Sequence, residues 1–190
     1  DEIEKLEVED LQAVSGLKAL RVNVKHEDKT ILQEAEVFVT KLFQERLDTK
    51  FLFHNLDHTK SVVLGIETLC KAEKLDEETT TVLLLSGWFH DSGYVECYDN
   101  HEKQSVNIAL EFLNAKNIAV GIQEKVANLI MATKLDYTPS NIQENIIKDA
   151  DNYHLGQEEY PKISELLRDE IAKVCEKEFS RSVKRYQWFG

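Results

Sequence analysis

The sequence predicts an all-α protein, folded as a compact single-domain bundle of six to eight helices. Turn-forming residues are scarce, with 7 Gly and 2 Pro among 190 residues. Leu, Glu and Lys, which favour helices, are frequent, and apolar residues recur at helical spacing in successive segments. A chain of 190 residues is long enough to bury a sizeable core in one domain.

Each predicted helix carries an apolar stripe, and most have a residue suited to begin or end them. Asn55 or Asp57 can cap one helix, and Asp76 and Asn100 can cap the two that follow. Gly93 suits a left-handed helix terminus. The predicted helices are Glu9–Leu20, Ile31–Leu47, 55–74, 77–90, 101–116, Val120–Lys134, Ile142–His154 and Pro161–Phe179, with a loop at Tyr94–Asn100.

The predicted organisation has three parts and no interdomain linker. Residues 1–30 form an acidic N-terminal segment, residues 31–179 the helical domain, and residues 180–190 a short basic tail. The chain lacks an initiator Met and ends abruptly at Trp188-Phe189-Gly190, so we expect it to be part of a longer protein.

Composition excludes several classes of function. A net charge of −12 argues against a nucleic-acid polymer as partner, because such a partner favours a basic surface. No apolar run approaches the roughly 20 residues of a membrane-spanning helix, and the opening Asp1–Asp10 carries six acids, unlike a signal peptide. Three widely spaced cysteines favour a reducing, cytoplasmic location. A small phosphorylated substrate remains compatible with this charge if a cation attracts it.

The most apolar stretch of the chain is Val82–Gly93, which reads VLLLSGWFHDSG. Its apolar residues cover most sides of a helix, so this helix should be buried nearly all round. It ends at His90-Asp91, and buried charged groups need partners. We interpret the pair as part of a metal site. The alternative is a buried His–Asp hydrogen bond that only stabilises the fold.

Two other segments offer ligands of the same kind. His54 and His58 are four residues apart, which places both rings on one face of a helix. The alternative is a pair that caps or packs at a helix start. Asp149 and Asp151 flank Ala150 and point in nearly opposite directions on a helix, so only one reaches a common site. Helical phase does not choose between them.

His101 and Lys134 are further candidates. His101 opens a helix with Glu102, which could also be a solvent-exposed first turn. Lys134 ends another helix, where a cation is favourable for its own sake.

Imidazoles and carboxylates without thiolates suit Mn, Fe, Co, Ni or Zn, and Mg less well. Two His and two Asp leave coordination positions open for a water that ionises near neutral pH. The chemistry that follows is hydrolysis of a phosphoester or phosphoanhydride bond.

His58, then His90-Asp91, then Asp151 resemble the H…HD…D pattern of the HD superfamily of metal-dependent phosphohydrolases. The resemblance implies a helical fold like that of HD domains and phosphodiesterases, with all four residues binding the metal. The family's last Asp follows an Ala, which favours Asp151 over Asp149. We expect one ion, with a second possible, and Asp91 could bridge to a second ion if one binds.

Phe53–His58 is similar to the Y-H-N-x-x-H segment of cyclic-nucleotide phosphodiesterases and many bacterial HD proteins, with Phe53 in place of Tyr. There the first His protonates the leaving oxygen, which implies that role for His54. His101 with Ser105 resembles a His that follows the HD pair in related nucleotide hydrolases, as a ligand or proton donor.

Trp88–Asp91, Ala132–Lys134, Asp149–Asp151 and Leu155-Gly156 look most like a bacterial group of predicted metal-dependent HD phosphohydrolases. That group often carries a His soon after the Ala-Thr-Lys segment. Here Leu135-Asp136-Tyr137 follows, so the His that would support a second metal is missing.

We therefore predict a metal-dependent phosphohydrolase that cleaves a small nucleotide or phosphorylated metabolite, and that forms a homodimer if it self-associates. The alternatives are a regulatory HD module that binds metal and nucleotide without turnover, and a purely structural bundle. The predicted site comprises His54, Asp91 and His101 as catalytic residues, Asn55 and Lys134 as substrate contacts, and His58, His90, Asp91 and Asp151 as metal ligands.

Overall fold

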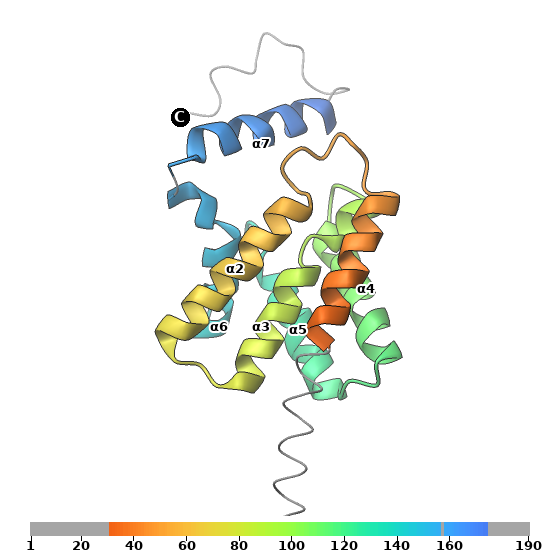
Figure 1. Ribbon diagram of the computed structural model, residues 1–190, viewed down its shortest axis with the longest axis vertical. Helices are drawn as coiled ribbons and strands as arrows, with labels where there is room; N and C mark the ends of the chain where they lie inside the picture. The colour runs from red at the N-terminus through yellow and green to blue at the C-terminus, as the bar shows by residue number, and fades with distance from the viewer. Residues whose placement is uncertain (1–30, 157, 175–190) are drawn as a thin grey trace, which may run out of the picture. The chain divides into compact units, whose positions relative to one another are not determined.

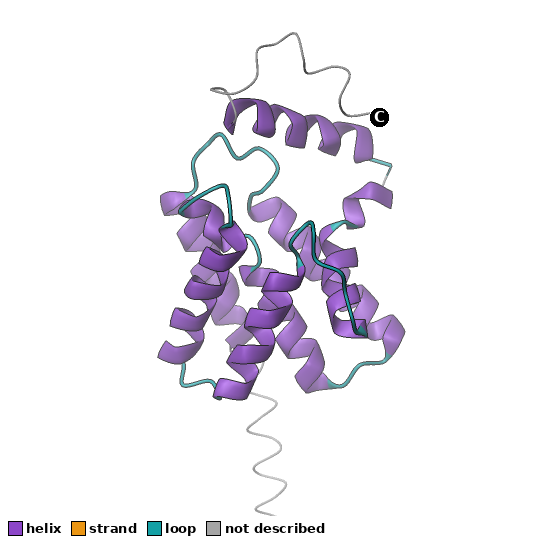
Figure 2. Cartoon of the chain, turned by 180° about the vertical axis from the view of Figure 1, so that it is seen from behind, coloured by secondary structure: helices purple, strands orange, loops and turns teal. Residues whose placement is uncertain are grey.

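The computed structural model describes residues 31–156 and 158–174, and within these residues all regular structure is helical (Figure 2). This confirms the all-α prediction, and the described residues alone form seven α-helices where six to eight were expected for the chain. The first described helix covers residues 31–46, and two 3₁₀ turns, η1 and η2, follow later. The other elements are α2 (Leu56–Glu73), α3 (Glu77–Phe89), η1 (Ser92–Val95), α4 (His101–Ala115), α5 (Val120–Ala132), α6 (Ile142–Asp151), η2 (Tyr153–Gly156) and α7 (Tyr160–Val174).

Helix α3 is the central helix of the fold and packs against α2, α4, α5 and α6 (Figure 1). Every residue from Val82 to Phe89 is buried, as the apolar sequence predicts. The ring of Phe89 lies 5.9 Å from Phe38 and 5.2 Å from Phe112, which joins the first helix and α4 to α3. Tight packing on all sides fixes the position of His90, which follows directly.

Side-chain caps begin α2, α3 and α6, and Asn141 is the cap of α6. Asn55, not Asp57, caps α2, because its Oδ1 accepts hydrogen bonds from the backbone N–H groups of Asp57 and His58. Asp76 caps α3 through the N–H of Thr79, as predicted. The predicted cap at Asn100 is wrong in its mechanism. Asn100 precedes α4 in a left-handed conformation with φ 59° and makes no side-chain capping bond.

Gly93 is required for space and not for a left-handed terminus, so that prediction was wrong. None of the described glycines has a positive φ, and Gly93 lies inside η1. A Cβ atom there would lie 2.0 Å from the carbonyl oxygen of His101 and 2.6 Å from the backbone nitrogen of Ser105. Glycine thus lets the turn after His90 lie directly against the first turn of α4.

Several helix ends differ from the prediction. Helix α5 ends at Ala132 before Lys134, and α6 ends at Asp151 before His154, where η2 takes over. The predicted segment 1–30 with its helix, residues 175–179 and the tail 180–190 lie outside the described residues. No helix in the described part of the chain combines the length and apolar character needed to span a bilayer.

Candidate metal centre

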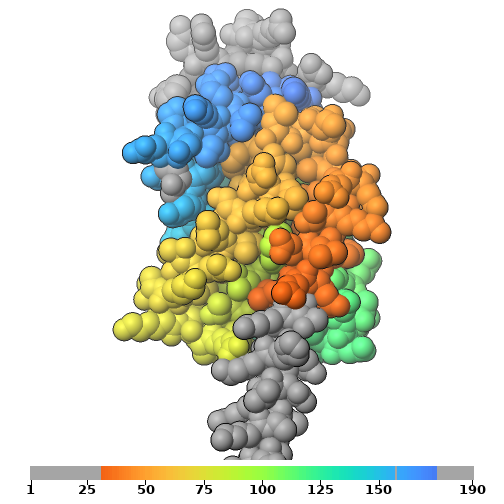
Figure 3. Space-filling view, in the orientation of Figure 1, coloured from red at the N-terminus to blue at the C-terminus, as the bar shows by residue number. Residues whose placement is uncertain are grey.

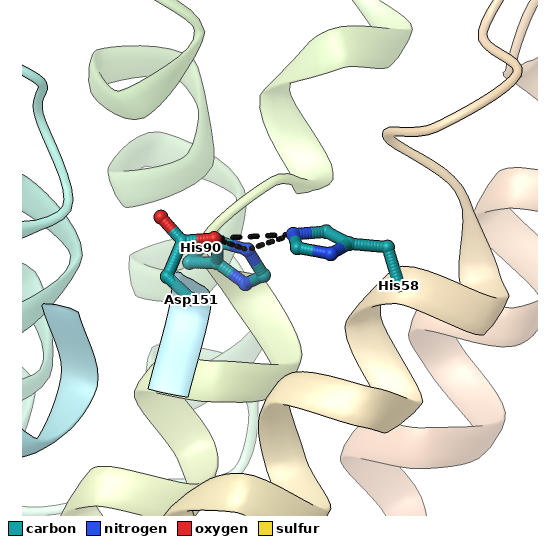
Figure 4. Close-up of side chains that lie close together, drawn as sticks. All are labelled: His58, His90 and Asp151. Atoms are coloured by element: carbon teal, nitrogen blue, oxygen red, sulfur yellow. Dashed lines mark hydrogen bonds and ion pairs between the residues drawn. The ribbon is translucent and has the colours of Figure 1, made fainter. Parts of the chain in front are cut away.

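Three helices bring His58, His90 and Asp151 to one point (Figure 4). His58 lies in the first turn of α2, His90 follows α3, and Asp151 is the last residue of α6. Each offers one ligand atom, and these atoms lie within 4.8 Å of one another. The Nε2 of His58 is 3.1 Å from Oδ1 of Asp151 and 3.4 Å from Nε2 of His90. This is the spacing of groups that could share one metal ion.

The imidazole of His90 is oriented by its own helix. Its Nδ1 lies 2.8 Å from the carbonyl oxygen of Gly87. A carbonyl only accepts hydrogen bonds, so Nδ1 carries the proton and Nε2 is left to face His58 and Asp151. Since His90 is fully buried, with 0% of its surface exposed, the ring is held in this orientation.

Asp91 adds a second carboxylate to this cluster. Its Oδ2 lies 3.2 Å from Nε2 of His90 and 3.4 Å from Nε2 of His58. Within residues 31–156 and 158–174, this oxygen is buried and makes no hydrogen bond. A buried carboxylate oxygen without a partner is costly. A metal ion held by the two imidazoles and the two carboxylates would satisfy it, so these residues fit a divalent cation.

The electrostatics of the cluster favour a positive charge. Burial lowers the pKa of His90, but Asp91 and Asp151 together outweigh it and hold that pKa well above its usual value. Burial raises the pKa of the Asp91 carboxyl, yet the imidazole of His90 brings it below the usual range. The pKa of Asp151 is likewise lowered, against burial, by its hydrogen bond with His58. A divalent cation would supply the charge that this field attracts.

His54 lies beside the cluster, in the loop before α2, and pairs with Glu170 of α7. Its Nδ1 contacts Oε1 of Glu170, whose Oε2 accepts hydrogen bonds from the backbone N–H groups of Phe53 and His54 at 2.8 and 3.0 Å. Burial lowers the pKa of His54, but the bond to Glu170 and the neighbouring carboxylates give a net increase. The ring therefore retains a proton more readily than a free histidine.

His101 and Tyr94 connect His54 with Asp91. The Nε2 of His101 lies 3.5 Å from Oδ1 of Asp91, and its Nδ1 lies 3.1 Å from the carbonyl oxygen of Tyr98. The Tyr94 ring stacks on His101 with centroids 3.8 Å apart and on His54 with centroids 4.4 Å apart. Burial raises the pKa of Tyr94 far above its usual range, so its hydroxyl stays neutral. One tyrosine thus fixes the spacing of both candidate proton donors.

The remaining predicted residues are placed less centrally. Asn55 is occupied as the cap of α2, and its Nδ2 donates to the carbonyl of Leu52 at 2.8 Å, so a substrate contact stays a prediction. Lys134 lies beyond the end of α5, and its side chain makes no hydrogen bond or ion pair with the other predicted site residues among those described. Asp149 is exposed, whereas Asp151 faces the cluster.

Three residues at the site were not predicted from the sequence: Glu170, Tyr94 and His154. The ring of His154 lies 5.0 Å from Phe53 and 6.4 Å from His58. Glu170 left a signal, because it falls in the stripe Ile163, Leu167, Glu170, Val174, where helical spacing calls for an apolar residue. Tyr94 and His154 lie in short 3₁₀ turns, which have no periodicity to indicate a buried face.

Comparison with known families adds one finding. A family model described as HD domain matches residues 55–156, which is more than half of the chain. The matched segment contains His58, His90, Asp91 and Asp151, whereas His54 and Glu170 lie outside it. No curated protein and no solved structure matches the chain.

Proposed function

The chain belongs to the HD domain family, a superfamily made up mostly of metal-dependent hydrolases, and on this premise we propose that it hydrolyses a phosphoester or phosphoanhydride bond. One observation carries the proposal. The buried Oδ2 of Asp91 has no hydrogen-bond partner among the described residues, although two imidazole nitrogens lie within 3.4 Å of it. Burying this carboxylate oxygen without a partner is costly, whereas contact with a cation would stabilise it.

The ligand set that we assign is His58, His90, Asp91 and Asp151. Mixed nitrogen and oxygen ligands without a thiolate suit Mn, Fe, Co, Ni or Zn better than Mg. When bound, such an ion lowers the pKa of water and draws negative charge from phosphoryl oxygens. The hydrogen bond from Nδ1 of His90 to Gly87 supports this assignment, because it keeps Nε2 directed at the cluster.

His54 is the favoured proton donor to the leaving oxygen. Its Nδ1 is occupied by Glu170, so Nε2 is the ring nitrogen left for substrate. Its raised pKa lets the ring hold its proton to a higher pH than a free histidine does. A positioned acid of this kind contributes roughly 10²- to 10⁴-fold to a rate. His101 ranks second, because its Nε2 lies 3.5 Å from Oδ1 of Asp91 and so faces a proposed metal ligand.

The substrate that we propose is a small nucleotide or another phosphorylated metabolite. With a net charge of −12, the chain as a whole repels polyanions, so positive charge for binding has to be local. We assign Lys134 to the phosphoryl oxygens and retain Asn55 as a secondary contact.

The test is elemental analysis of the purified chain, together with a metal-supplemented screen of phosphomonoesters, phosphodiesters and nucleoside phosphates. We expect near-stoichiometric metal and turnover of one substrate class, both lost in Asp151→Ala. Asp149→Ala is the matched control, because Asp149 is exposed on the same turn of α6 and should keep both. Metal without turnover would favour the regulatory module. Absence of metal under every loading condition would overturn the proposal.

A further inference from the structure

Helix α7 lies outside the segment that matches the HD domain, and its one buried residue is an acid, Glu170. The neighbouring acids Glu165 and Asp169 are exposed, with side-chain exposures of 55% and 58%. In the space-filling view, α7 (blue) lies over the loop that leads into α2 (orange; Figure 3). A helix that buries a carboxylate in place of an apolar side chain needs strong hydrogen bonds to offset the loss of solvation.

Glu170 makes those hydrogen bonds entirely with the turn that carries His54. The backbone N–H groups of Phe53 and His54 both donate to Oε2, and Nδ1 of His54 faces Oε1. A carboxylate only accepts, so it satisfies three donors at once, and Nδ1 must carry a proton. Backbone and ring are thus fixed together by a residue 116 positions further along the chain.

We propose that Glu170 is a positioning residue that holds His54 with Nδ1 protonated, so that Nε2 is the nitrogen that donates a proton to the leaving oxygen. The tautomer and ring orientation follow from the contacts alone. Only the use of that proton rests on the function proposed above.

Water supplies the atom that replaces the leaving group. As the water oxygen bonds to phosphorus and releases a proton to solvent, the phosphorus–oxygen bond to the leaving group breaks. The departing oxygen keeps that bonding pair and takes the proton from Nε2 of the imidazolium. The ring becomes neutral and keeps its Nδ1–H bonded to Glu170, which stays ionised throughout. Nε2 then takes a proton from solvent before the next turnover.

Glu170→Gln is the informative variant, because it keeps the volume and removes only the charge and one acceptor. The two backbone N–H groups require an oxygen at the position of Oε2, so the amide NH₂ faces Nδ1 of His54. Nδ1 then has to accept, and the ring is expected to switch to the neutral tautomer that is protonated at Nε2.

The first readout is ¹⁵N NMR of the histidine rings in the full chain, with and without Zn²⁺. In the unsubstituted chain we expect a hydrogen-bonded proton on Nδ1 of His54, assigned with His54→Ala. We expect Glu170→Gln to remove it and Asp169→Asn to leave it in place. An unprotonated Nδ1 in the unsubstituted chain, or unchanged shifts in Glu170→Gln, would overturn the proposal. Because this readout needs no turnover, it stands even if the proposed hydrolase activity fails.

The second readout separates positioning from simple stabilisation of the fold. For a substrate with an alkoxide leaving group, we expect Glu170→Gln to lower kcat by about 10- to 100-fold. This is less than the roughly 10²- to 10⁴-fold that a general acid contributes, because the ring of His54 is still present. A p-nitrophenyl ester leaves without a proton, so its kcat should change little. In His54→Ala, adding Glu170→Gln should cost nothing further. Equal losses on both esters, or additive losses in the double variant, would assign Glu170 a purely structural role.

Discussion

Replacing Gly93 with alanine tests how the turn after His90 is held against α4. A Cβ atom at Gly93 would lie 2.0 Å from the His101 carbonyl oxygen and 2.6 Å from the Ser105 nitrogen, both of them backbone atoms. Ordinary contact begins at 3.4 Å, so the start of α4 would have to move away by about 1.4 Å. A flexible side chain could yield at little cost, but a helix backbone cannot.

The cost of this movement has two parts. Overpacking of this kind costs about 1–3 kcal/mol. The shift also breaks the buried hydrogen bond from the Gly93 N–H to Oγ of Ser105, now 2.8 Å long. Leaving those groups unpaired costs roughly another 1–3 kcal/mol. We therefore expect the free energy of unfolding to fall by about 2–6 kcal/mol, a large share of the roughly 5–15 kcal/mol typical of a domain.

Urea unfolding followed by circular dichroism measures this loss. Gly121→Ala is the control, because a Cβ there meets nothing within 4 Å and alanine favours the helix by roughly 0.5–1 kcal/mol. Gly93→Asn separates the two explanations for the glycine. Asparagine tolerates a left-handed backbone but is larger than alanine, so close approach predicts a greater loss than in Gly93→Ala. A loss below about 1 kcal/mol in Gly93→Ala, or a more stable Gly93→Asn, would refute the reasoning.

Three further predictions concern the candidate metal centre and its support. Chelation should lower the melting temperature, because an ion at 100 to 1,000 times its Kd stabilises the fold by about 3–4 kcal/mol; an equal melting temperature with and without chelator would contradict metal binding. In the chelated chain, the pKa of His90 is higher in the folded state than its unfolded value of about 6.5. Protonated His90 therefore stabilises the fold fully below about pH 6.5, and this stabilisation is lost as pH rises through the folded pKa. The melting temperature should therefore fall as pH rises above about 6.5, less so in His90→Asn, and a rise would contradict it. Asn55→Ala should cost about 1 kcal/mol in urea unfolding through loss of the α2 cap, and Asn55→Asp much less; equal losses would exclude capping as the cause.

The fold was predictable because its signals are local. Apolar spacing and scarce turn-formers indicate the helices, and a cap such as Asp76 marks a start. Local sequence does not decide whether Asp149 or Asp151 is the ligand, because the helical periodicity of α6 is compatible with either. The structure resolves it through packing between helices. A Cβ on Gly65 of α2 would lie 3.3 Å from Cβ of Ala150, so Ala150 faces α2 and fixes the rotation of α6.

The error at Gly93 has a similar origin. A glycine after a helix fits either a left-handed terminus or the close approach of a distant backbone, and sequence alone does not separate the two. The structure gives the second answer, because α4 returns to the turn that follows His90. Glu170 was missed for the same reason, since its hydrogen-bonding partners precede it by more than a hundred residues.

The geometry of the candidate metal centre therefore depends on the positions of helix ends. His58 lies in the first turn of α2, His90 and Asp91 follow α3, and Asp151 ends α6. The relative placement of three helices therefore sets the geometry of the proposed ligands. An apolar core tolerates volume-conserving substitutions at modest cost, whereas a shift of one helix end by an ångström changes every ligand distance in the cluster. The small residues at close approaches, Gly65 and Gly93, should therefore affect metal affinity more strongly than core residues of equal burial.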